Sequence, residues 1–188
     1  MINRICIVTA AWIALVVNPL CSQVTGLQGW TIFLDPGHSQ KENTGLYNYS
    51  EAEKVLRVAL ALRDILQSQT DIDTVYISRT NDLDLVSLTQ RTNYANSVAA
   101  DFYYSIHSDA SGTPSVNSTL LLHGGWREGG QTLEKTPHGG KKMGDSITAF
   151  LTAAMRIGTR GNYADRTFYE GFPYEHTNKY PYLHVNRE

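Results

Sequence analysis

Cysteine is nearly absent from this chain of 188 residues, and its two copies lie near the N-terminus. Cys6 and Cys21 fall within or beside residues 1–22, so a chain that has lost this segment holds no thiol and forms no disulfide. Any metal site in the remainder must therefore use histidine and carboxylate ligands.

An excess of positive charge is also absent. Sixteen lysines and arginines stand against 18 acidic residues, which gives a net charge of -2 and a pI near 6.3. This balance excludes the basic field that nucleic acid or an anionic membrane surface attracts. With 41% hydrophobic and 18% charged residues, and no repeat or low-complexity segment, the composition fits one globular domain. We expect it to be a monomer.

Long hydrophobic runs are missing except at the N-terminus. Arg4 precedes an apolar stretch, Ile5 to Val17, that is too short to span a bilayer comfortably and is followed by Asn18-Pro19. We expect residues 1–22 to be a cleaved signal peptide and residues 23–188 to be an exported domain without stable membrane insertion. An uncleaved anchor stays open, and lipid modification of Cys21 is less favoured because residues 18–20 suit it poorly.

Strand-like and helix-like patterns alternate along the remainder. This alternation predicts a single α/β domain with a twisted, mostly parallel sheet and helices on both faces. The long segments 111–140 and 158–188 are expected to be mainly irregular. The predicted strands are 31–34, 74–78, 102–106, 119–122 and 182–185, and the predicted helices are 51–69, the later part of 82–99, and 141–157.

Two histidines follow predicted strands in the same way. The strand before His38 is expected to stop at Pro36, and Gly37 allows a sharp turn, in the stretch LDPGHSQ. The strand before His107 ends in SIHSDA. If both strands are parallel members of one sheet, the two imidazoles emerge at the same edge, where a metal site assembled from separate segments can form.

A carboxylate at the start of the first helix is the expected third ligand. Glu53 stands three places after Ser50, the arrangement of a capping box, whereas Glu51 lies on the helical stripe of Val55 that faces the sheet. We therefore favour Glu51. The simpler alternative is that Glu51 only interacts favourably with the helix N-terminus.

Four segments in order resemble the zinc-dependent N-acetylmuramoyl-L-alanine amidases of bacteria. They are LDPGHSQ, SEAEKVLRVALALRDIL, SRTNDLDLVSLTQRTNYAN and DFYYSIHSDA, and the resemblance is strong over residues 30–110. It implies a sheet of about six strands flanked by helices, and Zn²⁺ held by His38, Glu51 and His107. Four further residues fit family positions and are expected to support the fold and the ligands: Arg79, Arg91, Asn96 and Asp101.

The resemblance also implies a catalytic glutamate after a proline-led strand near the C-terminus. In YPYLHVNRE this maps onto Glu188, although the spacing from Pro181 is two residues longer than in the family. Glu170 and Glu175 are rivals, and all three could instead be ordinary exposed carboxylates. The sequence departs from the family at Ser39-Gln40 and Ser108-Asp109, which removes no ligand. Four histidines are left over, and none is favoured as a ligand: His123, His138, His176 and His184. His123 and His138 lie beside glycines in the long irregular segment and are expected to be solvated loop residues.

The resemblance implies hydrolysis of the amide between N-acetylmuramic acid and the L-alanine of a peptidoglycan stem peptide, and the expected signal peptide fits a reaction in the periplasm or cell-wall space. Both histidine ligands must be neutral to bind metal, so activity is expected to fall at acidic pH. Two alternatives remain: a zinc amidohydrolase acting on a smaller N-acyl amino acid, and an exported cell-wall-binding module without turnover.

Overall fold

The computed structural model describes residues 23–108, 113, 115–134, 140–170 and 181–187. The expected signal peptide, residues 1–22, lies outside this range. Within the range, no helix combines the length and the apolar character that crossing a bilayer requires.

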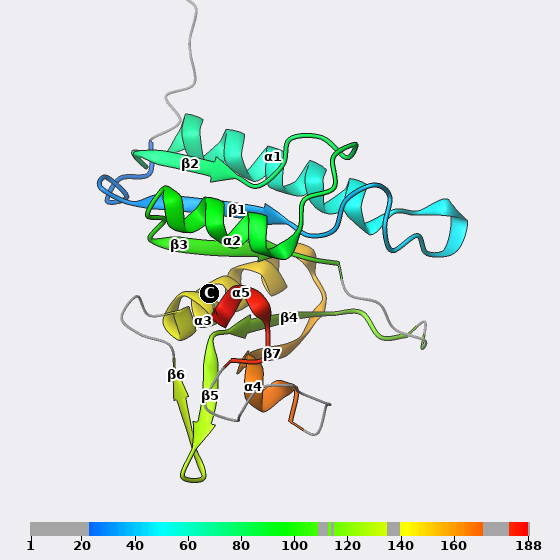
Figure 1. Ribbon diagram of the computed structural model, residues 1–188, viewed down its shortest axis with the longest axis vertical. Coiled ribbons are helices and arrows are strands. Elements are labelled where there is room, and N and C mark those ends of the chain that lie inside the picture. Colours follow the sequence, from blue (N-terminus) through cyan, green and yellow to red (C-terminus); the bar gives the residue numbers. More distant parts are fainter. Residues whose placement is uncertain (1–22, 109–112, 114, 135–139, 171–180, 188) are drawn as a thin grey trace, which may run out of the picture.

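The first half of the chain forms a three-stranded parallel sheet in the order β2-β1-β3. Its strands are β1 (Thr31–Pro36), β2 (Thr74–Ile77) and β3 (Phe102–Ile106). Because β1 is central, its carboxyl end has a neighbouring strand on each side (Figure 1). Pro36 is paired with Ile106, so the residues that follow β1 and β3 leave the sheet at the same edge.

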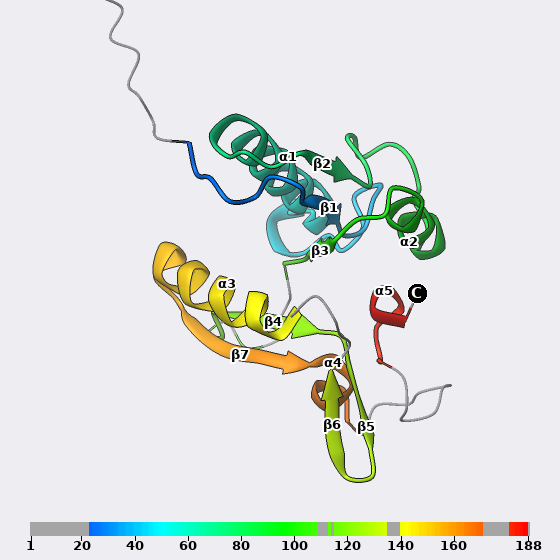
Figure 2. The same ribbon diagram turned by 90° about the vertical axis from the view of Figure 1, so that its left-hand side faces the viewer.

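Two helices cover opposite faces of this sheet, as Figure 2 shows: α1 (Glu51–Gln69) and α2 (Leu88–Ser97). Phe33 and Leu34 are adjacent in β1 and point to opposite faces, yet both are almost completely buried. On the α2 side, Tyr94 meets the Phe33 ring edge-on, with 5.2 Å between centroids. The α1 side is packed by Val55 and other small or aliphatic side chains of that helix.

Both helices begin at a serine that accepts a hydrogen bond from an amide of the first turn. Ser50 Oγ accepts from the Glu53 amide, which is one of the two hydrogen bonds of the predicted capping box. For this helix the described contacts hold no return bond from the Glu53 side chain. The reciprocal box, in which the third residue also reaches back to the cap amide, is formed at α2 by Ser87 and Gln90. The cap at α1 matters for function because it fixes Glu51 as the first helical residue.

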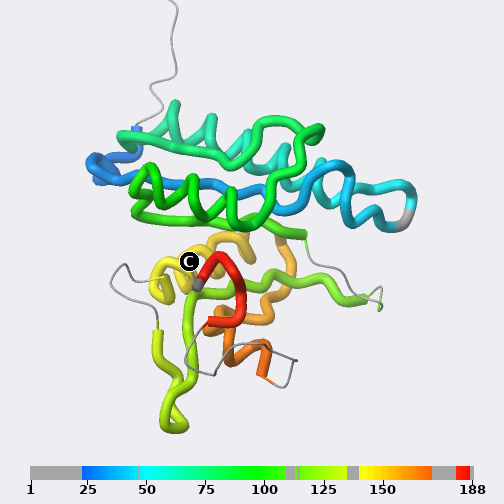
Figure 3. Tube along the Cα trace, in the orientation of Figure 1, coloured from blue at the N-terminus to red at the C-terminus, as the bar shows by residue number. Residues whose placement is uncertain are grey.

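The second half of the chain builds a separate layer, seen below the first in Figure 3. Strands β4 (Ser118–His123) and β7 (Gly158–Ala164) are parallel and connected through α3 (Gly140–Met155), which contacts both. Strands β5 (Gly125–Glu128) and β6 (Gln131–Glu134) form an antiparallel hairpin. Three short helical segments complete the described elements: η1 (Leu46–Asn48), α4 (Asp165–Phe168) and α5 (His184–Arg187).

The α/β class, the mainly parallel strands and the helices on both faces of the first sheet are confirmed. Several details differ from the sequence prediction. The described strands are divided among three sheets. Strand β1 runs through Pro36, because a proline at the last strand position sacrifices no required amide donor and its carbonyl still binds Arg79 and Arg91.

The predictions for the second half needed larger corrections. Residues 125–134 form a hairpin and residues 158–164 form a strand, where irregular structure was expected. The expected strand 182–185 is wrong: α5 begins at His184, because the buried Asp165 carboxylate binds the Leu183 amide and the Asn186 side chain and draws the chain into a turn.

Candidate metal centre

His38 lies just beyond the carboxyl end of β1, on a backbone that two buried arginines hold. Arg79 donates to the carbonyls of Pro36 and Gly37, at 3.0 and 2.9 Å. Arg91 donates to the carbonyl of His38 itself, at 2.8 Å. The position of the His38 backbone therefore depends on guanidinium groups supplied by the segment after β2 and by α2.

Backbone strain is concentrated after this point. Among the described residues, six of the eight non-glycine residues with positive φ lie between His38 and Asn48, including His38 itself at φ 58°. Non-glycine residues adopt this region at an energetic cost and tend to do so at functional sites. The connection between the first histidine and α1 is thus locally unfavourable and depends on the surrounding fold.

His107 follows β3 and meets His38 at the same edge of the sheet. The two rings lie edge to face, with centroids 4.8 Å apart. Gly37 makes this approach possible, because a Cβ atom at that position would lie 2.2 to 2.7 Å from three atoms of the His107 ring. Position 37 requires glycine because any side chain would collide with the His107 ring, and not because its φ is unusual.

Glu51 completes the cluster from the first position of α1. Only 6% of the residue is exposed. Its Oε2 lies 3.4 Å from His38 Nε2 and its Oε1 lies 3.3 Å from His107 Nδ1. The expectation that Glu51 shares the buried face of α1 with Val55 is confirmed. Farther along the helix, Val58 and Ile65 are about half exposed.

Two hydrogen bonds hold the Glu51 carboxylate. The Ser108 amide donates to Oε1 at 2.6 Å, and the Asn43 side chain donates to Oε2 at 3.0 Å. Burial raises the pKa of Glu51, but these hydrogen bonds, together with His38 and His107, outweigh it and leave the pKa below its usual value. Glu51 is therefore an anion at neutral pH.

The electrostatics also keep His107 neutral. Desolvation and the neighbouring His38 lower the pKa of His107, and the raising influence of Glu51 and Asp35 does not compensate. A neutral imidazole beside an ionised carboxylate is the protonation state that binds a divalent metal.

The three side chains fit a zinc ion. Their ligand atoms all lie within 4.8 Å of one another. Zinc bonds of about 2.0–2.2 Å in a tetrahedral arrangement place neighbouring ligand atoms about 3.3–3.6 Å apart. His38 and His107 each lie at about this distance from the Glu51 carboxylate, one from Oε2 and the other from Oε1. In addition, the Asn43 amide group contacts both His38 Nε2 and Glu51 Oε2. His38 Nε2 and Glu51 Oε2 therefore both face the same donor group, the Nδ2 of Asn43.

A second layer of buried charge lies beneath the ligands. Arg91 binds Asp35, and Asp35 also accepts hydrogen bonds from the hydroxyls of Tyr103 and Ser78, each at 2.6 Å. Arg79 extends the network to the carbonyl of Ala52, which adjoins Glu51, at 2.7 Å. One guanidinium thus braces the backbones that carry two candidate ligands.

The other two residues that were expected to support the ligands, Asp101 and Asn96, lie outside this buried network. Asp101 pairs the start of β3 with Thr31 at the opposite end of β1, through its side chain and its amide. Asn96 is exposed near the end of α2, where its carbonyl accepts from the Ala99 amide. Both belong to the fold rather than to the candidate metal centre.

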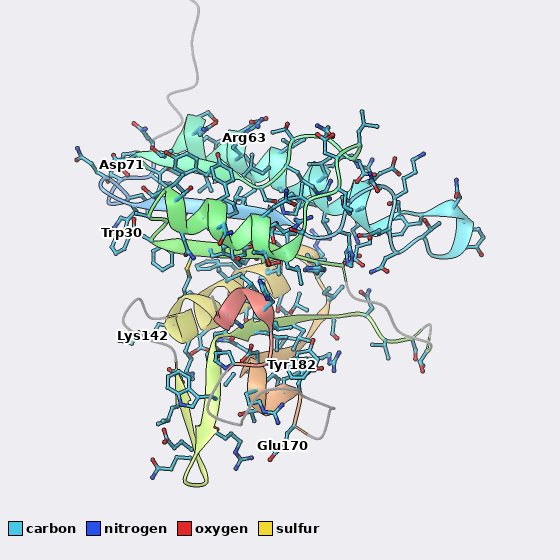
Figure 4. All side chains as sticks on the ribbon, in the orientation of Figure 1. Trp30, Arg63, Asp71, Lys142, Glu170 and Tyr182 are labelled. Atoms are coloured by element: carbon cyan, nitrogen blue, oxygen red, sulfur yellow. The ribbon has the colours of Figure 1, made fainter. Side chains whose placement is uncertain are left out.

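Of the three candidate proton carriers, only Glu170 lies within the residues that the structure describes. Glu188 and Glu175 lie outside the described residues. Glu170 is exposed, binds Arg127 of β5 through both carboxylate oxygens, and lies near α4, far from the ends of β1 and β3 in Figure 4. Glu170 therefore does not join the cluster in this structure.

The other histidines lie apart from the cluster or are not described. His123 was expected to be a solvated loop residue but is buried at the end of β4, where its Nδ1 contacts Asn162 Oδ1 at 3.0 Å. His184 begins α5. His138 and His176 lie outside the described residues.

Two contributors to the site were missed from sequence. Asn43 and Ser108 bind Glu51, but neither has a motif that announces this contact, since one lies in an irregular loop and the other uses its backbone amide. The sequence did offer a different signal of the site, Gly37. A glycine directly before His38 indicates that another group approaches the backbone closely there, and in the structure this group is the His107 ring.

Comparison with known proteins agrees with this geometry. The profile of the N-acetylmuramoyl-L-alanine amidase family Amidase_3 matches residues 32–179. The chain is 46% identical over 82 residues to the N-acetylmuramoyl-L-alanine amidase CwlM of Bacillus licheniformis, covering 43% of this chain and 32% of that protein. It is 43% identical over 90 residues to a sporulation-specific amidase of Bacillus subtilis, covering 47% and 35%. The aligned region thus spans about a third of these curated relatives.

Solved structures give the same result for the fold. The catalytic domain of CwlV from Bacillus (Paenibacillus) polymyxa superposes with a TM-score of 0.58 at 21% identity, covering 72% of this chain and 69% of that one. An N-acetylmuramoyl-L-alanine amidase of Clostridium difficile 630 gives 0.58 at 26% identity with the same coverage. The family is zinc-dependent, and His38, Glu51 and His107 form a candidate metal site in this chain. This chain belongs to the N-acetylmuramoyl-L-alanine amidase family.

Proposed function

We propose that this protein is a zinc-dependent amidase that cleaves the bond between N-acetylmuramic acid and L-alanine in peptidoglycan or muramyl peptides. The convergence of His38, Glu51 and His107 within 4.8 Å, in a member of this family, is the observation that carries the proposal. The same geometry would serve other zinc amidohydrolases, so the substrate assignment rests on the family.

The three clustered side chains are the proposed zinc ligands. When bound, zinc makes a water molecule more acidic and polarises the scissile carbonyl as negative charge develops on its oxygen. Glu51 contributes the ligand charge, and its hydrogen bonds from Ser108 and Asn43 keep it ionised and oriented. Arg79 and Arg91 hold the backbone from which His38 reaches the site.

Glu188 is the proposed general base and acid. A carboxylate near the reacting amide can accept the proton of the attacking water and deliver it to the departing amine of L-alanine. The support for Glu188 is its place after the proline-led segment YPYLHVNRE. Glu175 remains the alternative, since Glu170 is bound to Arg127 away from the cluster.

Export and a monomeric state are further parts of the proposal. The arginine and apolar stretch within residues 1–22 support secretion to the periplasm or cell-wall space, where the family's substrate lies. N-terminal sequencing of the secreted protein is expected to begin near residue 23. Retention of residues 1–22 on a membrane-bound product would instead support an anchor.

Metal content and product analysis test the activity directly. The full chain, loaded with one equivalent of zinc, is expected to release the free stem peptide from a muramyl peptide, as detected by mass spectrometry. His107→Ala should lose both zinc and hydrolysis, and Glu188→Gln should keep zinc and lose hydrolysis. Glu170→Gln is the matched control and should retain both.

The same assay separates the alternatives. Cleavage of simple N-acyl amino acids with no action on muramyl peptides would replace the substrate. Binding to intact murein without release of any product would favour a cell-wall-binding module and contradict the proposed reaction.

A further inference from the structure

Lys54 is held beside the candidate metal centre although it is an exposed lysine. It lies one turn after Glu51 on α1, and its ammonium group donates to Ser108 Oγ at 3.0 Å. The same ammonium lies over the Tyr49 ring, 5.4 Å from the centroid. Contacts from the end of β3 and from the loop before α1 thus restrict a side chain that is ordinarily free to rotate.

Ser108 connects this lysine to the candidate zinc ligands. Its amide donates to Glu51 Oε1 at 2.6 Å, and its hydroxyl accepts from Lys54. The Lys54 ammonium is therefore connected to the Glu51 carboxylate through one residue, Ser108, and lies beside the candidate metal cluster. Ser108 is also one of the positions where the sequence departs from the family pattern.

Lys54 forms no ion pair with a carboxylate in the part of the chain that the structure describes. Its recorded contacts there are a hydroxyl and an aromatic ring, and no carboxylate lies within ion-pair distance of Nζ. Nearby Glu51 is committed to Ser108 and Asn43. A restrained ammonium with open coordination is a binding point for an anion.

We propose that Lys54 binds a free carboxylate on the peptide side of the scissile amide, so that the enzyme prefers stem peptides carrying that charge. This inference rests on the proposed amidase function. The muramyl lactyl carboxyl is consumed in the scissile amide, so the substrate's free carboxylates lie on the peptide. In an extended chain, the carboxylate of the second residue lies within about 7 Å of the scissile nitrogen.

A purely structural role for Lys54 would contribute little. A hydrogen bond between an exposed ammonium and a hydroxyl is well solvated and has a small effect on stability. Removing Lys54 is therefore expected to leave the folded protein intact, which makes its effect on substrate choice measurable.

Two muramyl peptides that differ only in the α-carboxyl of the second residue, free or amidated, provide the test. The wild-type protein is expected to show a kcat/KM about two- to fivefold higher for the free carboxylate, mainly through KM. Lys54→Met should bring this ratio close to one, and Lys54→Arg should restore a preference. Lys142→Met, on the exposed surface of α3, is the matched control and should keep the wild-type ratio. Raising the salt concentration should reduce the preference.

Other results would overturn the inference. If Lys54→Met keeps the wild-type ratio, the carboxylate is recognised elsewhere or not at all. An equal loss of kcat on both peptides would place Lys54 in the chemical step instead. Hydrolysis of both peptides without a wild-type preference would refute the inference and leave the amidase function standing. If neither peptide is cleaved, the proposed function fails. In that case the affinities of the two peptides, measured by calorimetry, test the carboxylate site separately. Equal affinities for the free and the amidated peptide would reject the site as well.

Discussion

Within the described residues, each half of the molecule buries one aspartate, and the two carboxylates have different partners. Asp35 in β1 contacts Arg91 of α2 and the hydroxyls of Tyr103 in β3 and of Ser78, the residue after β2. Asp165, in the second half, is fully buried and accepts from the amides of Gly125, Arg166 and Leu183 and from the Asn186 side chain.

The partners of the two aspartates differ because Asp35 lies beneath the candidate metal centre, whereas Asp165 joins segments of the second half of the fold. Asp35 binds Arg91, which in turn binds the backbone carbonyl of His38. Burial together with Asp35 raises the pKa of Tyr103, so its phenol stays a donor. Asp165 mainly gathers backbone segments, joining β5, α4 and α5. Side-chain identity therefore specifies the first region more strongly than the second.

Asp35→Ala should have the largest effect. It leaves Arg91 buried without its carboxylate, which costs about 3–5 kcal/mol of unfolding free energy. Urea denaturation measures the change. Arg63→Ala is the control, because the Arg63–Asp64 pair is on the surface and its loss should cost less than about 1 kcal/mol. Similar costs for both variants would show that the buried network does not distinguish the first region.

Gly37→Ala should impair the metal centre more than the fold. The new methyl group would displace the His107 ring, whose side chain is 49% exposed and can move toward solvent. We expect zinc affinity to fall about 10- to 100-fold, measured by competition with a chelator. Gly158→Ala is the control, since nothing lies within 4 Å of its added Cβ. Wild-type zinc affinity in Gly37→Ala would contradict the close approach.

Asp165→Ala should destabilise the second region less than Asp35→Ala does the first. Buried amides lose their acceptor, at a cost of about 1–3 kcal/mol. Hydrogen exchange should show faster exchange at the Leu183 amide, while amides of β1 remain protected. A loss of protection in both regions would mean that the two halves unfold as one unit.

The exposed carboxylate of Asp71 offers a smaller, pH-dependent effect. Hydrogen bonds from the amides of Gly26 and Leu27 lower the pKa of Asp71. The stabilisation is therefore present above its ordinary value of 3.8 and is lost as pH falls through the lowered pKa. The amide signals of both residues should shift with that midpoint in NMR spectra, and Asp71→Asn should abolish the shift. Titration at or above 3.8 would contradict the two hydrogen bonds.

Phe150→Ser should have the smallest effect. Phe150 lies on α3 and is 79% exposed, so its replacement should change the unfolding free energy by less than about 0.5 kcal/mol. Thermal or urea unfolding is sufficient to check this. A cost of several kcal/mol would show that this face of α3 is packed, and would weaken the contrast between the two regions.

The same contrast explains which parts of the structure were predictable from sequence. In the first half, helical spacing and a serine cap predicted the bounds 51–69 of α1, and a short apolar run predicted β3. The meeting of His38 and His107 followed from parallel strands alone. These signals are local, or depend on one simple rule of sheet topology.

The second half depends on signals that are weaker or less local. Strand β7, GTRGNYA, is polar and largely exposed, so it lacks the alternation of a half-buried strand. Gly129 and Gly130, both at positive φ, form the turn between β5 and β6, and a two-glycine turn was a usable hairpin signal. The α5 turn depends on Asp165, a distant buried residue that no local pattern reveals.

The pairing of β3 with β1 also determines when a metal can be captured. Glu51 and Ser108 are 57 positions apart in the sequence, and His107 reaches the other two candidate ligands only after β3 has docked. A nascent or translocating chain therefore offers at most isolated, weak ligands to a passing ion, and loop-closure entropy opposes their chance encounter. Zinc loading would consequently report completed assembly of the first sheet, and a chain threaded unfolded across a membrane would arrive without its metal.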